Sequence, residues 1–275
     1  MATVVEKDDQ IIVLASSSSG IKPCQNLQPA PKYHDISDFQ ISPQADETFL
    51  FLGWSPDCIY MLKALASYTQ KHSRVRIICE DISQLSSGEF EKIPIEITVE
   101  QGNIFDKKTL SDIDWQFYEN IVIPGYGPGN DMLVARMYIL LKDALADRGF
   151  INNITVVFDN LLRNIAEEIS GVNIVSVDII FRIAAQILAH PDVMYAILEM
   201  ISPEGVEVYL KPVENYIVLE REVDFFTIIE SARRYNETAI GYITEQTSKI
   251  SLNPPKFEKK RFYHFDKIIV FSDHL

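Results

Sequence analysis

The chain has few cysteines and little positive charge. Its three cysteines, Cys24, Cys58 and Cys79, are widely spaced among 275 residues. They form neither a disulfide framework nor a CxxC metal knuckle, and so indicate a reducing compartment. The 25 basic residues are outnumbered by 39 acidic ones, which gives a net charge of −14. Nucleic-acid binders carry clustered basic residues, and proteins held on anionic lipid carry excess positive charge. An acidic chain of this kind fits neither class. We therefore expect no nucleic-acid partner.

Apolar runs long enough to cross a membrane are also missing. The most apolar stretch, Asp178 to Ile201, is interrupted by charged and polar residues and by Pro191, whereas a transmembrane helix needs about 20 nearly uncharged residues. The first residues lack the basic start and apolar core of a signal peptide. We expect a cytoplasmic protein with no direct membrane insertion. Hydrophobic residues still make up 47% of the chain, which is enough for one or two folded domains.

Residues 1–46 combine a short apolar segment with a long polar one. Gln10–Ala15 has the pattern of a buried strand. The serines, prolines and glutamines that follow are typical of a linker. The strand either crosses over to a later sheet or ends a domain that lies before residue 1, and its spacing leaves both interpretations open.

From residue 47 to residue 178, apolar strands alternate with amphipathic helices. This alternation predicts an α/β domain whose Rossmann-like, doubly wound parallel sheet is covered by helices on both faces. Strands are expected at residues 48–52, 74–79, 95–99, 120–123, 154–158 and 172–177, and the two longest helices at residues 56–69 and 130–147.

Residues 179–202 predict a crossover helix-turn-helix that breaks at His190-Pro191, because proline cannot continue the first helix. Both helices are apolar almost all the way round, a pattern that indicates burial on every side. The pair could form the core of its own domain, or it could pack as an arm into a second subunit. We favour the second interpretation, because the arm follows the last strand of a sheet that is already covered.

Residues 203–275 predict a small α+β lobe. Strands are expected at residues 205–210, 216–219, 239–243 and 267–272, a helix at 225–235 and a loop at 248–255. A basic loop stands out against the acidic background, and we interpret it as a solvated loop. Its charges are Lys256, Lys259, Lys260 and Arg261.

A ligand of such a parallel sheet would bind outside the carboxyl ends of the strands. The residues that follow those ends are the candidate ligand-binding residues of the chain. They are Gly53, Trp54, Ser55, Glu80, Asp81, Asn103, Gly125, Tyr126 and Asp159.

The turn after the first of these strands retains little of the dinucleotide fingerprint GxGxxG. It reads Gly53-Trp54-Ser55-Pro56-Asp57-Cys58, so that only the first glycine is present. The Ser55 side chain would crowd a pyrophosphate, and the Asp57 charge would repel it at the start of the helix. We therefore expect no NAD, and a cleft that holds water, a cation or a small neutral group. Ser55 or Asp57 is expected to cap the helix, and the Trp54 ring to cover part of the opening.

Catalytic groupings are missing as well. The five histidines are scattered over a linker, helix ends, a loop and the terminus, and none of the motifs GxSxG, HExxH or Tyr-x-x-x-Lys appears at a strand end. We expect no catalytic residues and no enzymatic activity. Carboxylates from distant segments could bind Ca²⁺ or another cation, but the chain has no EF-hand loop, and the ligands of such a site cannot be named.

Two parts of the chain carry a resemblance to a known family. The order of a Rossmann lobe, crossover helices and a small α+β lobe resembles an RCK domain (regulator of K⁺ conductance). Phe49–Asp57, FLFLGWSPD, is similar to the LCGWRRD-type opening of the Castor/Pollux ion channels, whose cytosolic region carries tandem RCK domains. The second lobe adds further matches. They are Glu204-Gly205 with Val208, Leu210-Lys211-Pro212, Phe225 to Ala232, Ile240-Gly241-Tyr242 and Asn253-Pro254-Pro255.

The resemblance covers residues 47–273 and implies a cytosolic regulatory module that gates a cation channel in response to a ligand or ion. It implies a homo-oligomer, a dimer or a gating ring, formed through Ile179–Ile201, and a membrane pore domain in the full-length protein. The strand near residues 9–15 would then end a preceding RCK lobe. Ser55, Cys58 and Asn103 depart from the pattern of nucleotide-binding RCK domains, which agrees with the expectation that the chain binds no NAD.

Two other functions stay open. One is an NAD(P)-dependent Rossmann-fold enzyme, which nicotinamide binding with turnover of a carbonyl substrate would reveal. The other is a stand-alone soluble regulator that docks onto a separate ion transporter. The length of the native gene separates the second from a channel module, because a pore would be encoded upstream of Met1.

Overall fold

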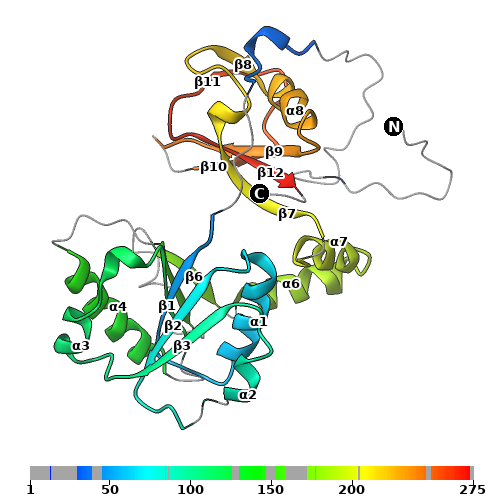
Figure 1. Ribbon diagram of the computed structural model, residues 1–275. Coiled ribbons are helices and arrows are strands. Elements are labelled where there is room, and N and C mark those ends of the chain that lie inside the picture. Colours follow the sequence, from blue (N-terminus) through cyan, green and yellow to red (C-terminus); the bar gives the residue numbers. More distant parts are fainter. Residues whose placement is uncertain are drawn as a thin grey trace. The chain divides into compact units, whose positions relative to one another are not determined.

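The structure is a computed structural model of the chain (Figure 1). It describes residues 13, 30–38, 45–83, 85, 87–125, 130–146, 153–158, 172–176, 178–203, 205–245 and 249–272. The chain forms two compact units, one of residues Gln44–Pro191 and one of Met1–Pro43 together with Asp192–Leu275. Apart from Val13, the strand expected at Gln10–Ala15 lies outside the described residues.

The first unit is built on a six-stranded parallel sheet, as the sequence predicts. Its strands follow the order β3-β2-β1-β4-β5-β6. Phe49 of β1 pairs with Val75 of β2 on one side and with Asn120 of β4 on the other. The strands are β1 (Thr48–Leu52), β2 (Arg74–Cys79), β3 (Glu96–Gln101), β4 (Asn120–Ile123), β5 (Asn153–Phe158) and β6 (Val172–Ser176). This doubly wound order confirms the α/β class.

Both faces of the sheet are buried, which explains the uninterrupted apolar run of β1. Leu50 and Leu52 point into one core cluster with Val134 and Met137 of α4 (Asp131–Leu145). Phe49 and Phe51 point into the opposite cluster with Ile59 and Leu62 of α1 (Cys58–Tyr68). Successive side chains of a strand alternate between its faces, so α1 and α4 cover opposite faces. The shorter helices are α2 (Ser87–Phe90), α3 (Lys107–Ser111) and the 3-10 helix η3 (Trp115–Phe117).

The predicted crossover helices are present as α6 (Asp178–Ala189), in the first unit, and α7 (Val193–Met200), in the second. The break falls at His190-Pro191, as expected from the proline. The expectation that these helices are buried on all sides is not met within one chain. Ile197 is the one residue of the two helices that is buried.

The second unit contains the C-terminal α+β lobe. An antiparallel sheet in the order β10-β9-β12-β7 packs with α8, and β8 and β11 form a separate pair. Asp224 caps α8, because its carboxylate accepts the Thr227 N–H at 2.9 Å. The elements are β7 (Glu207–Pro212), η4 (Val213–Asn215), β8 (Glu222–Asp224), α8 (Phe225–Arg233), β9 (Thr238–Ile243), β10 (Ile250–Leu252), β11 (Lys259–Arg261) and β12 (Lys267–Ser272).

Three expectations for this lobe are wrong. Residues 216–219 are not a strand: Tyr216 follows the 3-10 helix η4, and Ile217 forms a single β-bridge with Ile36. The loop expected at 248–255 contains β10, and the basic loop contains β11. In β11, Lys259 pairs with Asp224 and Arg261 with Glu222 across the strands. Three-residue strands are too short to show a periodic pattern, which is why the sequence hides them.

Residues 31–38 fall inside the segment that we expected to be a linker. In the structure they include the 3-10 helix η2 (Tyr33–Asp35) and the bridge from Ile36 to Ile217, and they lie on the C-terminal lobe. Ile36 and Asp35 are buried there.

Candidate functional site

The parallel sheet places its switch point between β1 and β4, where the chain winds in opposite directions. Gly53 follows β1 and Gly125 follows β4. Glu80 and Asp81 follow β2, and Asn103 comes two residues after β3. The carboxyl ends of these four strands therefore meet along one edge, which is where ligands of such sheets bind. Two of the predicted site residues, Tyr126 and Asp159, lie outside the described residues.

The turn from β1 to α1 is closed on itself. Gly53 has a φ of 108°, a value that favours glycine, and its N–H donates to the Ile78 carbonyl at 2.8 Å. The Ser55 N–H donates to the Cys58 Sγ at 3.3 Å, and the Ser55 Oγ lies 3.5 Å from the same sulfur. Both residues are buried. A thiol thus occupies the position of the third fingerprint glycine.

The predicted side-chain cap of α1 is wrong for Asp57. This residue stands at the N-cap in helical geometry, and its side chain makes no capping hydrogen bond. Ser55 contributes its carbonyl instead, which accepts the Cys58 N–H at 3.0 Å. The Asp57 carboxylate is exposed, so it can repel an anion at the helix start, as the sequence predicts.

Burial raises the pKa of the Cys58 thiol, and it is also the main cause of the raised pKa of Cys79, to which the Asp81 charge adds. Because the thiolate is the reactive form, both thiols are poor nucleophiles near neutral pH. The two free cysteines in the described residues therefore have structural positions at this edge of the sheet.

The side chains of two further polar candidates, Asp81 and Asn103, accept hydrogen bonds within local turns. The Asp81 carboxylate accepts the Ser83 N–H at 2.8 Å and the Ser83 hydroxyl at 2.6 Å. The Asn103 side chain accepts the Phe105 N–H at 2.8 Å. These are Asx turns, which orient the loops after β2 and β3. Glu80 is exposed, and its backbone carbonyl accepts a hydrogen bond from the Gln101 side chain at 3.0 Å.

Trp54 is half-buried and packs edge-on against Phe90 of α2, with ring centroids 5.6 Å apart. That it covers the opening of the cleft stays a prediction. Within the part of the chain that the structure describes, no group of three His, Cys, Asp or Glu side chains is placed to hold a metal ion. A cation site at this edge likewise stays a prediction.

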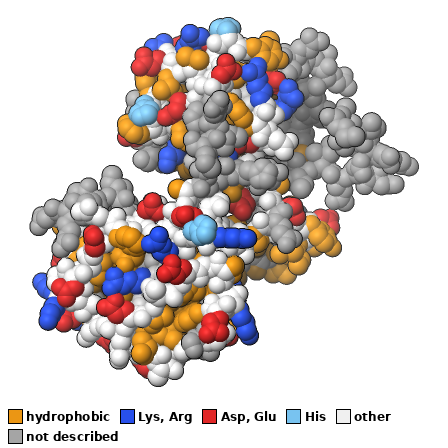
Figure 2. All heavy atoms as spheres, viewed as in Figure 1, with side chains coloured by type: hydrophobic (Ala, Val, Ile, Leu, Met, Phe, Trp, Pro, Cys, Tyr) orange, Lys and Arg blue, Asp and Glu red, His pale blue; other side chains and the backbone are white. Residues whose placement is uncertain are grey.

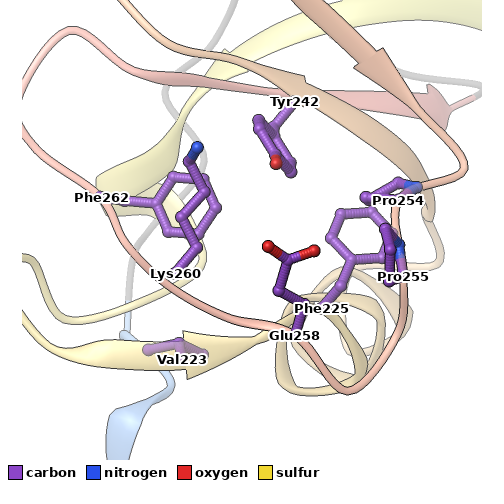
Figure 3. A pocket seen from close by; sticks show the side chains of 8 residues that line it. All are labelled: Val223, Phe225, Tyr242, Pro254, Pro255, Glu258, Lys260 and Phe262. Atoms are coloured by element: carbon purple, nitrogen blue, oxygen red, sulfur yellow. The ribbon is translucent and has the colours of Figure 1, made fainter.

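A second hollow lies in the C-terminal lobe, and sequence reasoning did not single it out (Figure 3). Its walls are Val223, Phe225, Tyr242, Pro254, Pro255, Glu258, Lys260 and Phe262. The Lys260 Nζ lies 4.8 Å from the centre of the Tyr242 ring, and the Lys256 Nζ lies 4.7 Å from that of Phe225. The Glu258 carboxylate points into the hollow. The space that remains in the hollow is about the size of one water molecule. The chain's own lysines thus occupy the faces of these two rings, as in a cation–π pair. The aromatic residues on β9 and around β11 were the available signal for this site.

Among the described residues, none of the helices combines the length and apolar character of a membrane span. The sheet order, the crossover helices and the small second lobe together define a Rossmann-like α/β fold with an additional α+β lobe. The human SLO3 gating ring shares this fold with a TM-score of 0.59, over 82% of this chain and 44% of that one, at 9% sequence identity.

The sequence relatives are ion channels. The probable ion channel POLLUX of Oryza sativa subsp. japonica is 20% identical over 97% of this chain and 32% of its own length. The probable ion channel CASTOR of the same species is 18% identical over 98% of this chain and 35% of its own length. No family model matches the sequence. These findings confirm the resemblance to Castor/Pollux channels, and the chain spans about a third of the length of these relatives.

Proposed function

We propose that this chain is the RCK-type regulatory module of a Castor/Pollux-like cation channel, which converts ligand or ion binding into work on a gate. The observation that carries the proposal is the match to ion channels over nearly the whole chain, combined with the fold of a gating ring. The closed β1–α1 turn and the scattered histidines favour a regulatory role over a Rossmann-fold enzyme. In the full-length protein a pore domain would act as partner, and the module would lie on its cytosolic face.

The crossover helices supply the second argument, because they carry apolar side chains that the chain itself leaves exposed. In α6, Phe181 is 59% exposed and Leu188 is 84% exposed, and in α7, Tyr195 is 77% exposed. Hydrophobic side chains gather at the surface over both helices (Figure 2). Fully burying one such side chain contributes about 1.5–3 kcal/mol. We infer that a second copy of the chain covers these helices, which makes the module a dimer or part of a ring.

Sedimentation of the purified chain at micromolar concentration tests this assembly. We expect a dimer or a larger closed oligomer, and we expect α6 and α7 to be protected from proteolysis in it. A strictly monomeric chain in which both helices resist proteolysis would contradict the proposal, because the arm would then be covered by its own chain. A stable monomer would instead favour a stand-alone regulator of a separate transporter.

Calorimetry with NAD(H) tests the prediction for the β1–α1 turn. We expect no saturable binding at micromolar nucleotide, because Ser55 and Cys58 fill the positions that pyrophosphate needs, and Asp57 adds a repulsion of about 0.3–1 kcal/mol. The double variant Ser55→Gly/Asp57→Ala removes two of these obstacles and serves as the comparison. If the unmodified chain binds NAD(H) at micromolar concentration and the double variant binds it with the same affinity, our interpretation of this turn is wrong. Binding with turnover of a carbonyl substrate would favour the enzyme.

A further inference from the structure

Residues 31–38, which we call the strap, bind to the C-terminal lobe as an added strand would. The Ser37 N–H donates to the Tyr216 carbonyl at 3.0 Å, and the Val218 N–H donates to the Asp35 carbonyl at 2.8 Å. These two bonds flank the antiparallel bridge between Ile36 and Ile217. Residues 216–218 belong to no sheet, but the main-chain pairing is of the kind by which a sheet edge binds an extended peptide.

Side chains of the strap add specificity to this backbone pairing. Ile36 is 7% exposed and Asp35 is 4% exposed, so both are buried against the lobe. The Asp35 carboxylate accepts a hydrogen bond from the Arg221 guanidinium at 2.7 Å, and the same nitrogen donates to the His34 carbonyl at 3.3 Å. A buried acid needs such a partner, and Arg221 is therefore a recognition residue for an acid at this position.

The strap is also bound by α8 and its neighbours. The Lys32 N–H donates to the Thr227 Oγ1 at 3.0 Å, and the Lys32 ammonium donates to the Glu222 carbonyl at 3.0 Å. Arg234, which follows α8, lies over the Tyr33 ring at 5.5 Å. The strap thus contacts three parts of the lobe: the bridge at Ile217, the start of β8 and both ends of α8.

The bridge leads directly into the core of the lobe. The Tyr216 carbonyl, which accepts the Ser37 N–H, also accepts the Ser231 hydroxyl of α8 at 2.6 Å. The Tyr216 hydroxyl in turn donates to the buried Glu237 carboxylate at 2.5 Å. A movement of the strap therefore acts first on groups that hold α8 against the sheet.

We propose that residues 216–218, Arg221 and Thr227 of the C-terminal lobe form a docking site for an extended peptide and that the strap is its ligand in cis. The site selects an acidic residue followed by an aliphatic one, with a lysine three positions before the acid. The strap therefore ties the chain before residue 30 to the C-terminal lobe. A pull on that part of the chain reaches this lobe first and the parallel sheet only afterwards. This inference rests on the proposed function only where it takes such a pull as a gating signal.

A disulfide across the bridge tests the docking in cis. Ile36 and Ile217 form a non-hydrogen-bonded pair, in which Cα atoms lie about 4.5 Å apart, within the range that a disulfide spans. In the full chain carrying Cys24→Ser, the double variant Ile36→Cys/Ile217→Cys should form an intramolecular disulfide under mild oxidation, identified by mass spectrometry of the linked peptides. The two single variants are the controls. Thiols at positions 36 and 217 that stay unlinked in the oxidised double variant, or a covalent dimer linked through them, would overturn the proposal; Cys58 and Cys79 are buried free thiols in every variant.

Hydrogen exchange tests whether the docked strap stabilises the lobe. Ile36→Asp should speed exchange of the Val218 amide about 30-fold or more, the factor that corresponds to about 2 kcal/mol, and leave the amides of β1 and β2 unchanged. The matched control is Ile250→Asp, which makes the same change at a site that is 54% exposed in the same lobe. Equal protection of Val218 in both variants would overturn the proposal. If Ile36→Asp does not fold, the disulfide experiment becomes the test of the proposal, because it probes the same contact between positions 36 and 217 without placing a charge in it. A monomeric chain would contradict the proposed assembly and leave both of these results intact.

Discussion

Replacing Lys211 with methionine is expected to lower the free energy of unfolding of the C-terminal lobe by about 3–5 kcal/mol. The Lys211 ammonium lies 2.6 Å from the Glu237 carboxylate, and the two side chains are 11% and 3% exposed. Methionine has nearly the same length and no charge, so the variant keeps the packing and leaves the Glu237 carboxylate buried without its cation. Removing one member of a buried ion pair is costly for that reason.

Tyr216 does not compensate for the missing cation. Its hydroxyl donates to the other oxygen of Glu237, and burial together with this carboxylate raises the pKa of Tyr216 above its usual value. The phenol therefore stays a neutral donor, which supplies a hydrogen bond but no charge. The double variant Lys211→Met/Glu237→Leu should cost less than Lys211→Met, because it buries no unpaired carboxylate.

The two tryptophans allow the lobes to be monitored separately. Trp54 and Trp115 both belong to residues Gln44–Pro191. Tryptophan fluorescence in urea therefore reports the unfolding of the first unit, whereas hydrogen exchange in β7, β9 and β12 reports that of the C-terminal lobe. We expect the fluorescence midpoint to be unchanged in Lys211→Met while exchange in the lobe accelerates. If Lys211→Met lowered the free energy of unfolding of the lobe by less than about 1 kcal/mol, Lys211 and Glu237 would not be a buried pair in which each charge needs the other. An equal decrease in the double variant would contradict that assignment too.

Charges placed on α6 are expected to dissociate the assembly. In the double variant Phe181→Glu/Leu188→Glu, two side chains lose a burial energy of about 1.5–3 kcal/mol each, and two carboxylates would have to be buried without partners. The association constant should fall at least 100- to 1,000-fold, measured by sedimentation over a concentration series. Because both residues are exposed in the single chain, the fold itself should tolerate the change.

The matched control for this experiment is Tyr60→Glu on α1. Tyr60 is 70% exposed, close to the exposure of the α6 residues, and lies on the surface of the parallel domain. We expect Leu188→Glu alone to weaken association and Tyr60→Glu to have no effect. An unmodified chain that associates, together with an α6 double variant that associates equally well, would place the interface elsewhere.

The parallel domain could be predicted from the sequence in detail. The bounds of β1, β2 and β4 agree with the expected ranges, because strands buried on both faces are short apolar runs between polar residues. The carboxyl ends that carry Gly53, Glu80 and Gly125 follow directly from those bounds. The way in which the turn closes could not be predicted. The contact between Ser55 and the Cys58 sulfur, three positions later, depends on the backbone geometry of the turn, which the residue types alone do not specify.

The short elements of the C-terminal lobe were less predictable. β8, β10 and β11 have three residues each, and β8 and β11 pair with each other across a long stretch of chain, with Lys259 opposite Asp224. Lys259 and Arg261 therefore look like a solvated basic loop until Asp224 and Glu222 are found opposite them. Which residues lie opposite each other is a property of the strand register, which a single segment does not contain.

The sequence by itself determined the class of fold, the order of its parts and the apolar character of the crossover helices, because these depend on hydrophobic periodicity and on the position of Pro191. Only the tertiary structure decided that residues 31–38 lie on the C-terminal lobe and that Asp35 is paired with Arg221, 186 positions away. The physical reason is that periodicity records which face of a segment avoids water, whereas the partner of a polar stretch is set by hydrogen bonds and charges that meet only after the chain has folded.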